Sequence, residues 1–129
     1  GDLNGSNLYL PANGPIRVTD ADCCDWGAPW LDLGVLLAHM HILGSLSYSA
    51  TLYAVPFLTA YMEAFPQAKP YPFLRRVYQT AGLELVHAVL GPVQSGLVHD
   101  VYLRETFLNL AATMAENPIA LEDYRALTQ

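Results

Sequence analysis

The stretch GDLNGSNLYLPANGPIRVTDAD, residues 1–22, contains two short apolar runs separated by a turn signal. Residues 8–10 and 16–19 are predicted to be strands, and Asn13-Gly14 between them is a strong signal for a tight hairpin turn. A proline stands on each side of this turn, and proline has no N–H to donate to a sheet ladder. The sequence therefore predicts a small two-stranded hairpin near the N-terminus.

Polar side chains occur directly before the first predicted strand and directly after the second. Asn7 follows Asp2 by five positions and Asp20 follows it by eighteen; Asp22 comes two positions later. Transfer of a phosphoryl group needs a carboxylate beside the attacking hydroxyl. It also needs an amide oxygen and a second carboxylate to bind the magnesium ions that bridge the nucleotide phosphates. Because a loop followed by a short hairpin can bring such side chains to one point, we expect a phosphoryl-transfer site here.

Two further motifs follow in order, Gly27-Ala28-Pro29 and Asp32-Leu33-Gly34. With these motifs, residues 1–37 resemble the catalytic region of the aminoglycoside phosphotransferase-like small-molecule kinases, a superfamily that includes methylthioribose, choline, homoserine and fructosamine kinases. Several ordered motifs at fixed spacing are more specific than any one of them alone. Two departures from the usual pattern are the missing histidine before Gly1 and the aspartate at position 22, where glutamate is more common.

The resemblance implies a role for each of five residues. Asp2 would be the catalytic base that accepts the proton of the substrate hydroxyl. Asn7 and Asp20 would be metal ligands for magnesium, with Asp22 as a second acid beside them. Asp32 would give structural support, as a buried acid that braces the catalytic loop through backbone amides near its start. The implied cofactors are Mg²⁺ and ATP or GTP, and the implied substrate is a small molecule with a hydroxyl group.

The same resemblance implies a domain organisation. Residues 1–129 correspond to the helical C-terminal lobe of a protein-kinase-like fold, and the N-terminal nucleotide lobe is expected to be a missing partner. That lobe supplies a strand lysine and a loop over the phosphates, whereas the single lysine here, Lys69, follows every motif. We therefore expect a kinase by lineage whose isolated chain is largely inactive. The alternative is a catalytically silent helical interaction module derived from that fold, and the acceptor substrate stays open.

The rest of the sequence has helical signals. Helices are predicted at residues 31–43, 52–64, 71–90, 97–115 and 119–127. Gly91-Pro92 is expected to end the third helix, and Asn117-Pro118 to begin the last one with proline at its first position. The predicted fold class is therefore mainly α, with one small hairpin.

Composition favours a single compact domain that keeps some apolar surface. A chain of 129 residues can bury roughly two-thirds of its unfolded surface. Hydrophobic residues make up 53% and charged residues 14%, so an apolar face toward the missing lobe or toward a second copy, as a homo-oligomer, is expected. The net charge of −6 without a basic stripe argues against nucleic acid. No uninterrupted apolar run reaches the roughly 20 residues of a membrane span.

Three other groups of reactive side chains have simpler interpretations. Cys23-Cys24 is an adjacent pair, a spacing unsuited to a disulfide or a zinc site, so a reduced loop pair in a cytoplasmic protein is expected. His39 and His41 are two positions apart on a helix and should face different ways, one in the core and one at the surface. Glu84 and His87, three positions apart, are expected to form an ordinary pair on a helix surface.

Overall fold

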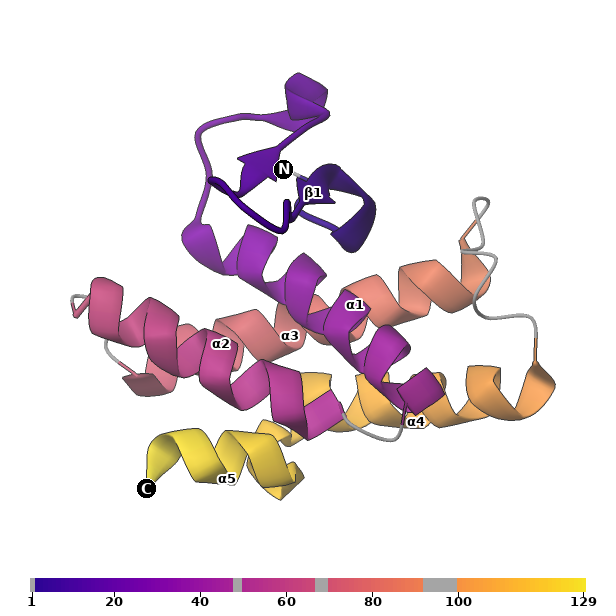
Figure 1. Cartoon of the computed structure of the whole chain (residues 1–129). Coiled ribbons are helices and arrows are strands. Elements are labelled where there is room, and N and C mark those ends of the chain that lie inside the picture. Colours follow the sequence, from indigo (N-terminus) through magenta and orange to yellow (C-terminus); the bar gives the residue numbers. More distant parts are fainter. Residues whose placement is uncertain (1, 48–49, 67–69, 92–99) are drawn as a thin grey trace.

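The computed structural model describes residues 2–47, 50–66, 70–91 and 100–129 of the chain. This described part is mainly α-helical with one small antiparallel hairpin near the N-terminus, as the sequence predicted (Figure 1). Its helices are α1 (Pro29–Ser47), α2 (Ala50–Ala64), α3 (Pro70–Leu90), α4 (Val101–Glu116) and α5 (Glu122–Thr128).

The helix ends follow local signals with one difference. α3 ends directly before Gly91, as predicted, whereas Pro92 and residues 97–99 of the predicted fourth helix lie outside the described residues. Proline at position 118 begins a separate 3-10 turn, η3 (Pro118–Ala120), and α5 starts only at Glu122. The proline therefore starts a helical turn as expected, but the chain re-extends at Leu121 before the last helix.

The hairpin pairs β1 (Leu8–Tyr9) with β2 (Arg17–Val18), with Leu8 opposite Val18. Both strands are shorter than predicted, because the two prolines near the turn have no N–H groups with which the ladder could continue. Gly14 in the turn has a φ of 126°, a value that glycine adopts without steric cost. The turn therefore lies where the Asn-Gly pair predicted it.

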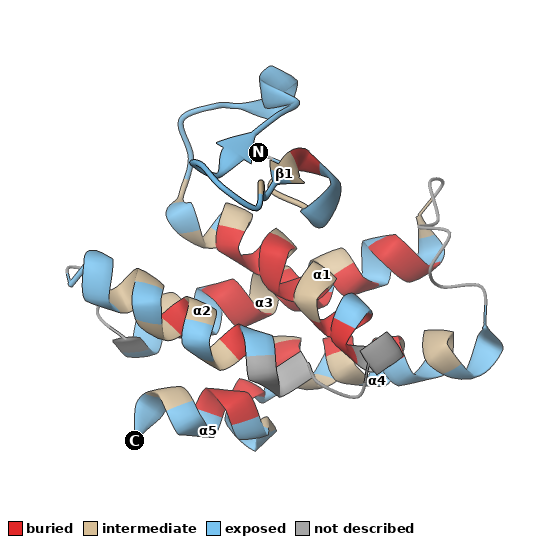
Figure 2. Cartoon of the chain, viewed as in Figure 1, coloured by how far each residue is buried: buried red, intermediate tan, exposed pale blue. Residues whose placement is uncertain are grey.

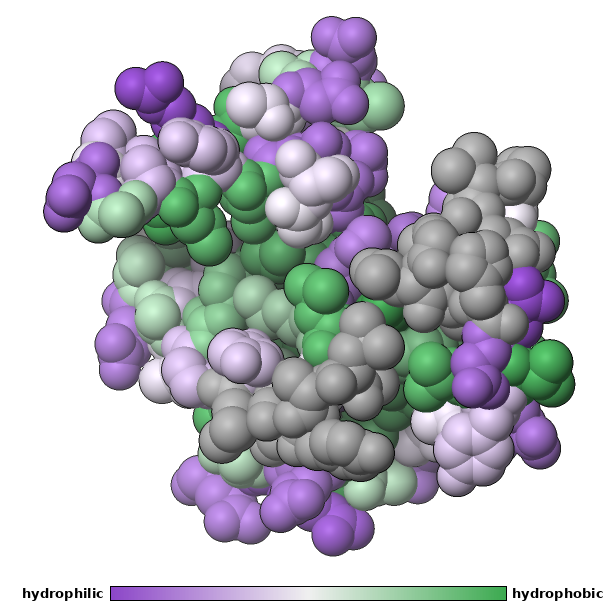
Figure 3. All heavy atoms as spheres, turned by 45° about the vertical axis from the view of Figure 1, so that its right-hand side comes forward, coloured by the Kyte–Doolittle hydropathy of each residue, from purple (hydrophilic) through white to green (hydrophobic). Residues whose placement is uncertain are grey.

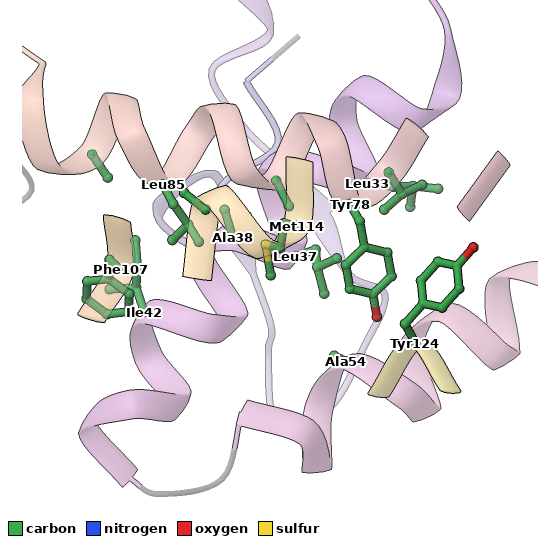
Figure 4. Packing of buried hydrophobic residues seen from close by; sticks show 14 of the residues in the cluster. Leu33, Leu37, Ala38, Ile42, Ala54, Tyr78, Leu85, Phe107, Met114 and Tyr124 are labelled. Carbon is green, nitrogen blue, oxygen red and sulfur yellow. The ribbon is translucent and has the colours of Figure 1, made fainter. Parts of the chain in front are cut away.

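The hydrophobic core lies where α3 packs against α1 and α4, while α2 packs against α1, and α5 against α2. The hairpin lies beyond the first turn of α1 and is largely exposed (Figure 2). Buried side chains come from all five of these helices, and Figure 4 shows several of them, including Leu37, Ile42, Leu85, Phe107 and Met114. No helix in the described part of the chain is both long and apolar enough to cross a membrane.

Two glycines allow the helices to approach each other closely. A Cβ atom added to Gly34 in α1 would overlap the Cβ of Thr80 and lie 2.9 Å from the carbonyl oxygen of Val77, both in α3. A Cβ atom added to Gly82 in α3 would lie 2.8 Å from the carbonyl oxygen of Ala111 in α4. Protein interiors are close-packed and cannot accommodate such short contacts without moving. The packing of α1 and α4 on α3 therefore depends on these two positions.

Replacing Gly34 with alanine should destabilise the fold. Alanine favours a helix over glycine by about 1 kcal/mol, but overpacking a tight contact typically costs about 1–3 kcal/mol. We expect a net loss of up to about 2 kcal/mol in the free energy of unfolding, measured by denaturant titration. Gly27→Ala is the control, since its Cβ would meet Leu31 at an ordinary 3.7 Å. A gain in stability for Gly34→Ala would show that α1 and α3 do not meet here.

Candidate functional site

Asp2 and Asn7 lie together, and side-chain hydrogen bonds hold them in place. The amide nitrogen of Asn7 donates to the backbone carbonyl of Asp2 at 2.9 Å and to its carboxylate Oδ2 at 3.2 Å. The other carboxylate oxygen, Oδ1, accepts a hydrogen bond from the side chain of Asn4 at 2.9 Å. Because Asn7 is buried and Asp2 is exposed, a fixed amide orients an accessible carboxylate.

The segment around Asn7 is joined to the end of β2. The backbone N–H of Thr19 donates to the carbonyl oxygen of Asn7 at 2.9 Å, and the Thr19 hydroxyl donates to the same oxygen at 3.3 Å. The next residue, Asp20, has φ 55° and ψ 58° and is the one non-glycine residue with a left-handed backbone in the described ranges. This conformation costs a residue with a side chain roughly 1–2 kcal/mol, and such residues are concentrated at functional sites.

A small hollow opens where this loop, the end of β2 and the first turn of α1 meet; the loop and hairpin lie over the start of α1 in Figure 1. It measures about 80 Å³, and its described lining consists of Asp2, Leu3, Val18, Thr19, Asp20, Cys24 and Asp32. Three aspartates from separate segments of the sequence therefore line one space. That space is large enough for a small ion with a few water molecules.

The predicted base and metal ligands are placed differently relative to the hollow. Asp2 and Asp20 both line it, as the spacing predicted. Asn7 does not belong to the described lining: its buried side chain donates from its amide nitrogen to Asp2, which leaves the amide oxygen as the atom that could bind a metal. Asp22 is exposed on the 3-10 turn η2 (Ala21–Cys23) and does not belong to the described lining. Because the backbone is left-handed at Asp20 and then forms the 3-10 turn η2, Asp22 lies outside the lining to which Asp20 belongs.

Asp32 lies in the first turn of α1 and is half-buried, where a fully buried acid was expected. It lines the hollow together with Asp2 and Leu3, which is the position that a support for the N-terminal loop requires. Gly1, one of the residues whose amides it was expected to bind, lies outside the described residues. A carboxylate in the first turn also interacts favourably with the helix dipole.

The hollow provides a partial metal site. Among the residues that the structure describes, no three His, Cys, Asp or Glu side chains are grouped as a complete metal site. Magnesium seldom requires one, because it is usually bound by one or two carboxylates, several waters and the phosphates of a substrate. Carboxylate and amide oxygens, as on Asp20 and Asn7, are the hard ligands that it prefers. These oxygen ligands therefore suit a magnesium ion that is also bound by a phosphate ligand better than a magnesium ion bound by the protein alone.

Three residues of this region were not anticipated from the sequence. Asn4 orients Asp2, and its side chain also accepts a hydrogen bond from the Ser6 N–H at 2.8 Å, which caps the 3-10 turn η1 (Gly5–Asn7). The signal for Asn4 was present, since asparagine before small polar residues is typical of such caps. Thr19 and Cys24 line the hollow because of how the chain folds, and no pattern in the neighbouring sequence predicts this position.

A second polar cluster is buried in the helical body. The hydroxyl of Tyr78 in α3 donates to Oδ2 of Asp123 in α5 at 2.7 Å, and Nε2 of His41 in α1 lies 3.5 Å from the same oxygen. Burial acts to raise the pKa of Asp123, but the interaction with the nearby His41 and the hydrogen bond from Tyr78 outweigh it and hold that pKa below its ordinary value. Because all three side chains are buried, we interpret the cluster as a structural link between α1, α3 and α5.

Glu84 contacts two histidines at the edge of the body. Its Oε1 lies 3.8 Å from Nε2 of His39 in α1, and its Oε2 lies 3.6 Å from Nδ1 of His87, one turn later in α3. The predicted Glu84–His87 pair is therefore present, with His39 as a further member. His39 is partly exposed while His41 is buried, which confirms that the two histidines face different ways. Partly exposed pairs of this kind contribute little to stability.

Comparison with known proteins gives no relative: no family model, no curated protein and no solved structure matches the chain at a significant level. A functional assignment is therefore based on the geometry of the chain's own residues. The resemblance to the small-molecule kinases stays a prediction from the sequence motifs.

The Asp123 carboxylate should make the fold less stable in acid. Its pKa in the folded state is below the ordinary value of 3.8, so its ionised form stabilises the fold above that pH. This stabilisation is lost as the pH falls through the lower, folded-state pKa. Asp123→Asn should remove this part of the acid dependence and lower the free energy of unfolding at neutral pH by about 1–3 kcal/mol, because Tyr78 and His41 lose a charged partner.

Thermal melts of the two proteins between neutral pH and about pH 2 measure both effects. Glu105→Gln, at an exposed position of α4, is the matched control and should leave the acid dependence unchanged. If Asp123→Asn and the unaltered chain lose stability in parallel, the buried cluster is not as described.

Proposed function

We propose that this chain is the catalytic-loop lobe of an ATP-dependent phosphotransferase that phosphorylates a hydroxyl group of a small molecule. The observation that supports this best is the hollow that Asp2, Asp20 and Asp32 line, where the N-terminal loop and the end of β2 meet the first turn of α1. The first two are the residues that the resemblance marks as base and metal ligand. The left-handed backbone at Asp20 adds support, because such strain is kept where a side chain must be held in a particular direction.

Each side chain has its own role in the proposed reaction. The Asp2 carboxylate, oriented by neighbouring amides, accepts the proton of the attacking hydroxyl. The Asp20 carboxylate and the Asn7 amide oxygen hold Mg²⁺, which supplies charge stabilisation at the nucleotide phosphates when it is bound. Asp32 supports the loop from the first turn of α1. Asp22, exposed and outside the described lining, is expected to matter less than Asp20.

The proposal includes a partner lobe for the nucleotide. Kinases of this mechanism hold the phosphates with a lysine and a covering loop, and the single lysine of the sequence, Lys69, lies outside the described residues. A second lobe would supply both groups, and a cytoplasmic setting would supply ATP or GTP. For this chain alone we expect weak binding of the magnesium nucleotide, because the carboxylates bind the metal ion but do not bind or position the γ-phosphate.

A catalytically silent interaction module is the second candidate function. The observation in its favour is a set of large apolar side chains in the second half of α3 and at the start of α4 that remain exposed by about two-thirds or more: Leu83, Leu90, Val101 and Tyr102. Apolar surface also reaches the face that is turned forward in Figure 3, between polar regions. A module of this kind would bind a second copy or another protein through such surface and would not need the geometry at Asp2 and Asp20.

Calorimetric titration with Mg²⁺ separates the two candidates. The phosphotransferase proposal expects millimolar binding that Asp20→Asn weakens at least about tenfold, because that carboxylate is the principal metal ligand. Glu116→Gln removes the same charge from the exposed end of α4 and should leave the affinity unchanged. If Mg²⁺ does not bind, or if both variants weaken it equally, while light scattering shows concentration-dependent dimers, the interaction module is the better assignment.

A further inference from the structure

The first half of α3 carries a second hollow, remote in sequence from the acidic one. It measures about 450 Å³, and its described lining consists of Tyr71, Pro72, Arg75, Arg76 and Gln79. These positions lie on the outer side of α3, where the two arginines and Tyr71 are exposed. Two guanidinium groups therefore flank one space in a chain whose net charge is −6.

Neither arginine has an acidic partner among the residues that the structure describes. The chain has 12 acidic residues and 6 basic ones, yet no described carboxylate forms an ion pair with Arg75 or Arg76. Arg76 is instead held over the ring of Trp30, with its guanidinium carbon 5.7 Å from the ring centroid. Such a contact restrains the side chain and leaves its N–H groups able to donate.

A buried hydroxyl, that of Tyr124 in α5, interacts electrostatically with two residues of this lining but does not itself belong to it. Tyr124 is 1% exposed, and its hydroxyl has no hydrogen-bond partner among the described residues. Burial raises the pKa of Tyr124, and its electrostatic neighbours are Tyr71 and Arg75, both of which line the hollow. Figure 4 shows the hydroxyl pointing away from that of Tyr78, which binds Asp123.

An unpartnered buried hydroxyl is uncommon and requires an explanation. A donor left unsatisfied destabilises the fold, and the Tyr124 hydroxyl is such a donor at neutral pH, because tyrosine ionises only near about pH 10. A ligand that draws the exposed side chains of Tyr71 or Arg75 aside would give this neutral donor an acceptor. The hollow and the hydroxyl are independent observations that point to the same kind of ligand, one rich in acceptor oxygens.

We propose that Arg75, Arg76 and Gln79 form a binding site for the phosphate group of a small molecule, with the buried hydroxyl of Tyr124 as a further donor. Guanidinium groups present paired N–H donors that match the oxygens of a phosphate. The volume of about 450 Å³ is within the usual range for small-molecule sites. This site shares no residue with the acidic hollow, so it does not depend on the phosphotransferase proposal.

Titration of the chain with inorganic phosphate, followed by amide chemical shifts in NMR spectra, tests the site. Saturable shifts are expected around residues 71–79 and at Tyr124, and sodium chloride at equal ionic strength should not reproduce them. Arg75→Gln and Arg76→Gln should each weaken phosphate binding about tenfold or more, as the loss of a charge-assisted hydrogen bond predicts. Arg17→Gln removes an equal charge from the exposed hairpin and should have no effect.

Tyr124→Phe separates a ligand role from a structural one. Because the hydroxyl has no hydrogen-bond partner in the described part of the chain, this variant should melt at the same temperature as the unaltered chain or higher in the absence of phosphate. It should nevertheless bind phosphate roughly two- to tenfold more weakly, the effect of one neutral hydrogen bond. Shifts that do not saturate, or an equal loss of affinity in Arg17→Gln, would show general charge screening and overturn the proposal.

Discussion

The hydrogen bond from the backbone N–H of Thr19 to the carbonyl oxygen of Asn7, 2.9 Å long, joins the two segments on which the candidate site depends. The hairpin has only two residues in each strand and is largely exposed, and an isolated hairpin of this size is marginally stable at best. The bond holds Asn7 beside Thr19, and Asp20 follows Thr19 directly in the chain. The left-handed backbone at Asp20 then turns its carboxylate toward the hollow that Asp2 also lines.

The helical body gives this loop a rigid base. α1 supplies Asp32 from its first turn, and the absence of a side chain at Gly34 allows α1 to pack tightly on α3. At its other end, α1 is linked through His41 to Asp123 in α5 and so to Tyr78 in α3. A site carried by packed helices keeps its geometry better than one carried by loops alone. The acidic hollow therefore combines a short, exposed loop with a firmly packed support.

The sequence predicted those features of the fold and of the candidate site that depend on residues close together in the chain. The turn at Asn13-Gly14 requires the backbone freedom of glycine, and that requirement is visible in the residue types. The meeting of Asp2 and Asp20 was predictable because a hairpin of known length separates them. The position of Asp22 outside the described lining was not predictable, because nothing in the sequence indicates the left-handed turn at Asp20. The bond of Tyr78 with Asp123, 45 positions away, depends on how the last helix docks, which no local pattern specifies.

In the proposed phosphotransferase site, Asp2 and Asp20 face a common position for a divalent ion. Line broadening of amide resonances by substoichiometric Mn²⁺ tests it most directly, because a paramagnetic ion broadens the nuclei nearest to it. We predict early loss of signals from residues 2–7 and 19–24 and from Asp32, with those of α4 and α5 left sharp, and suppression of the effect by Asp20→Asn. Broadening spread over exposed acids such as Glu105 and Glu122, and unchanged by Asp20→Asn, would contradict the account.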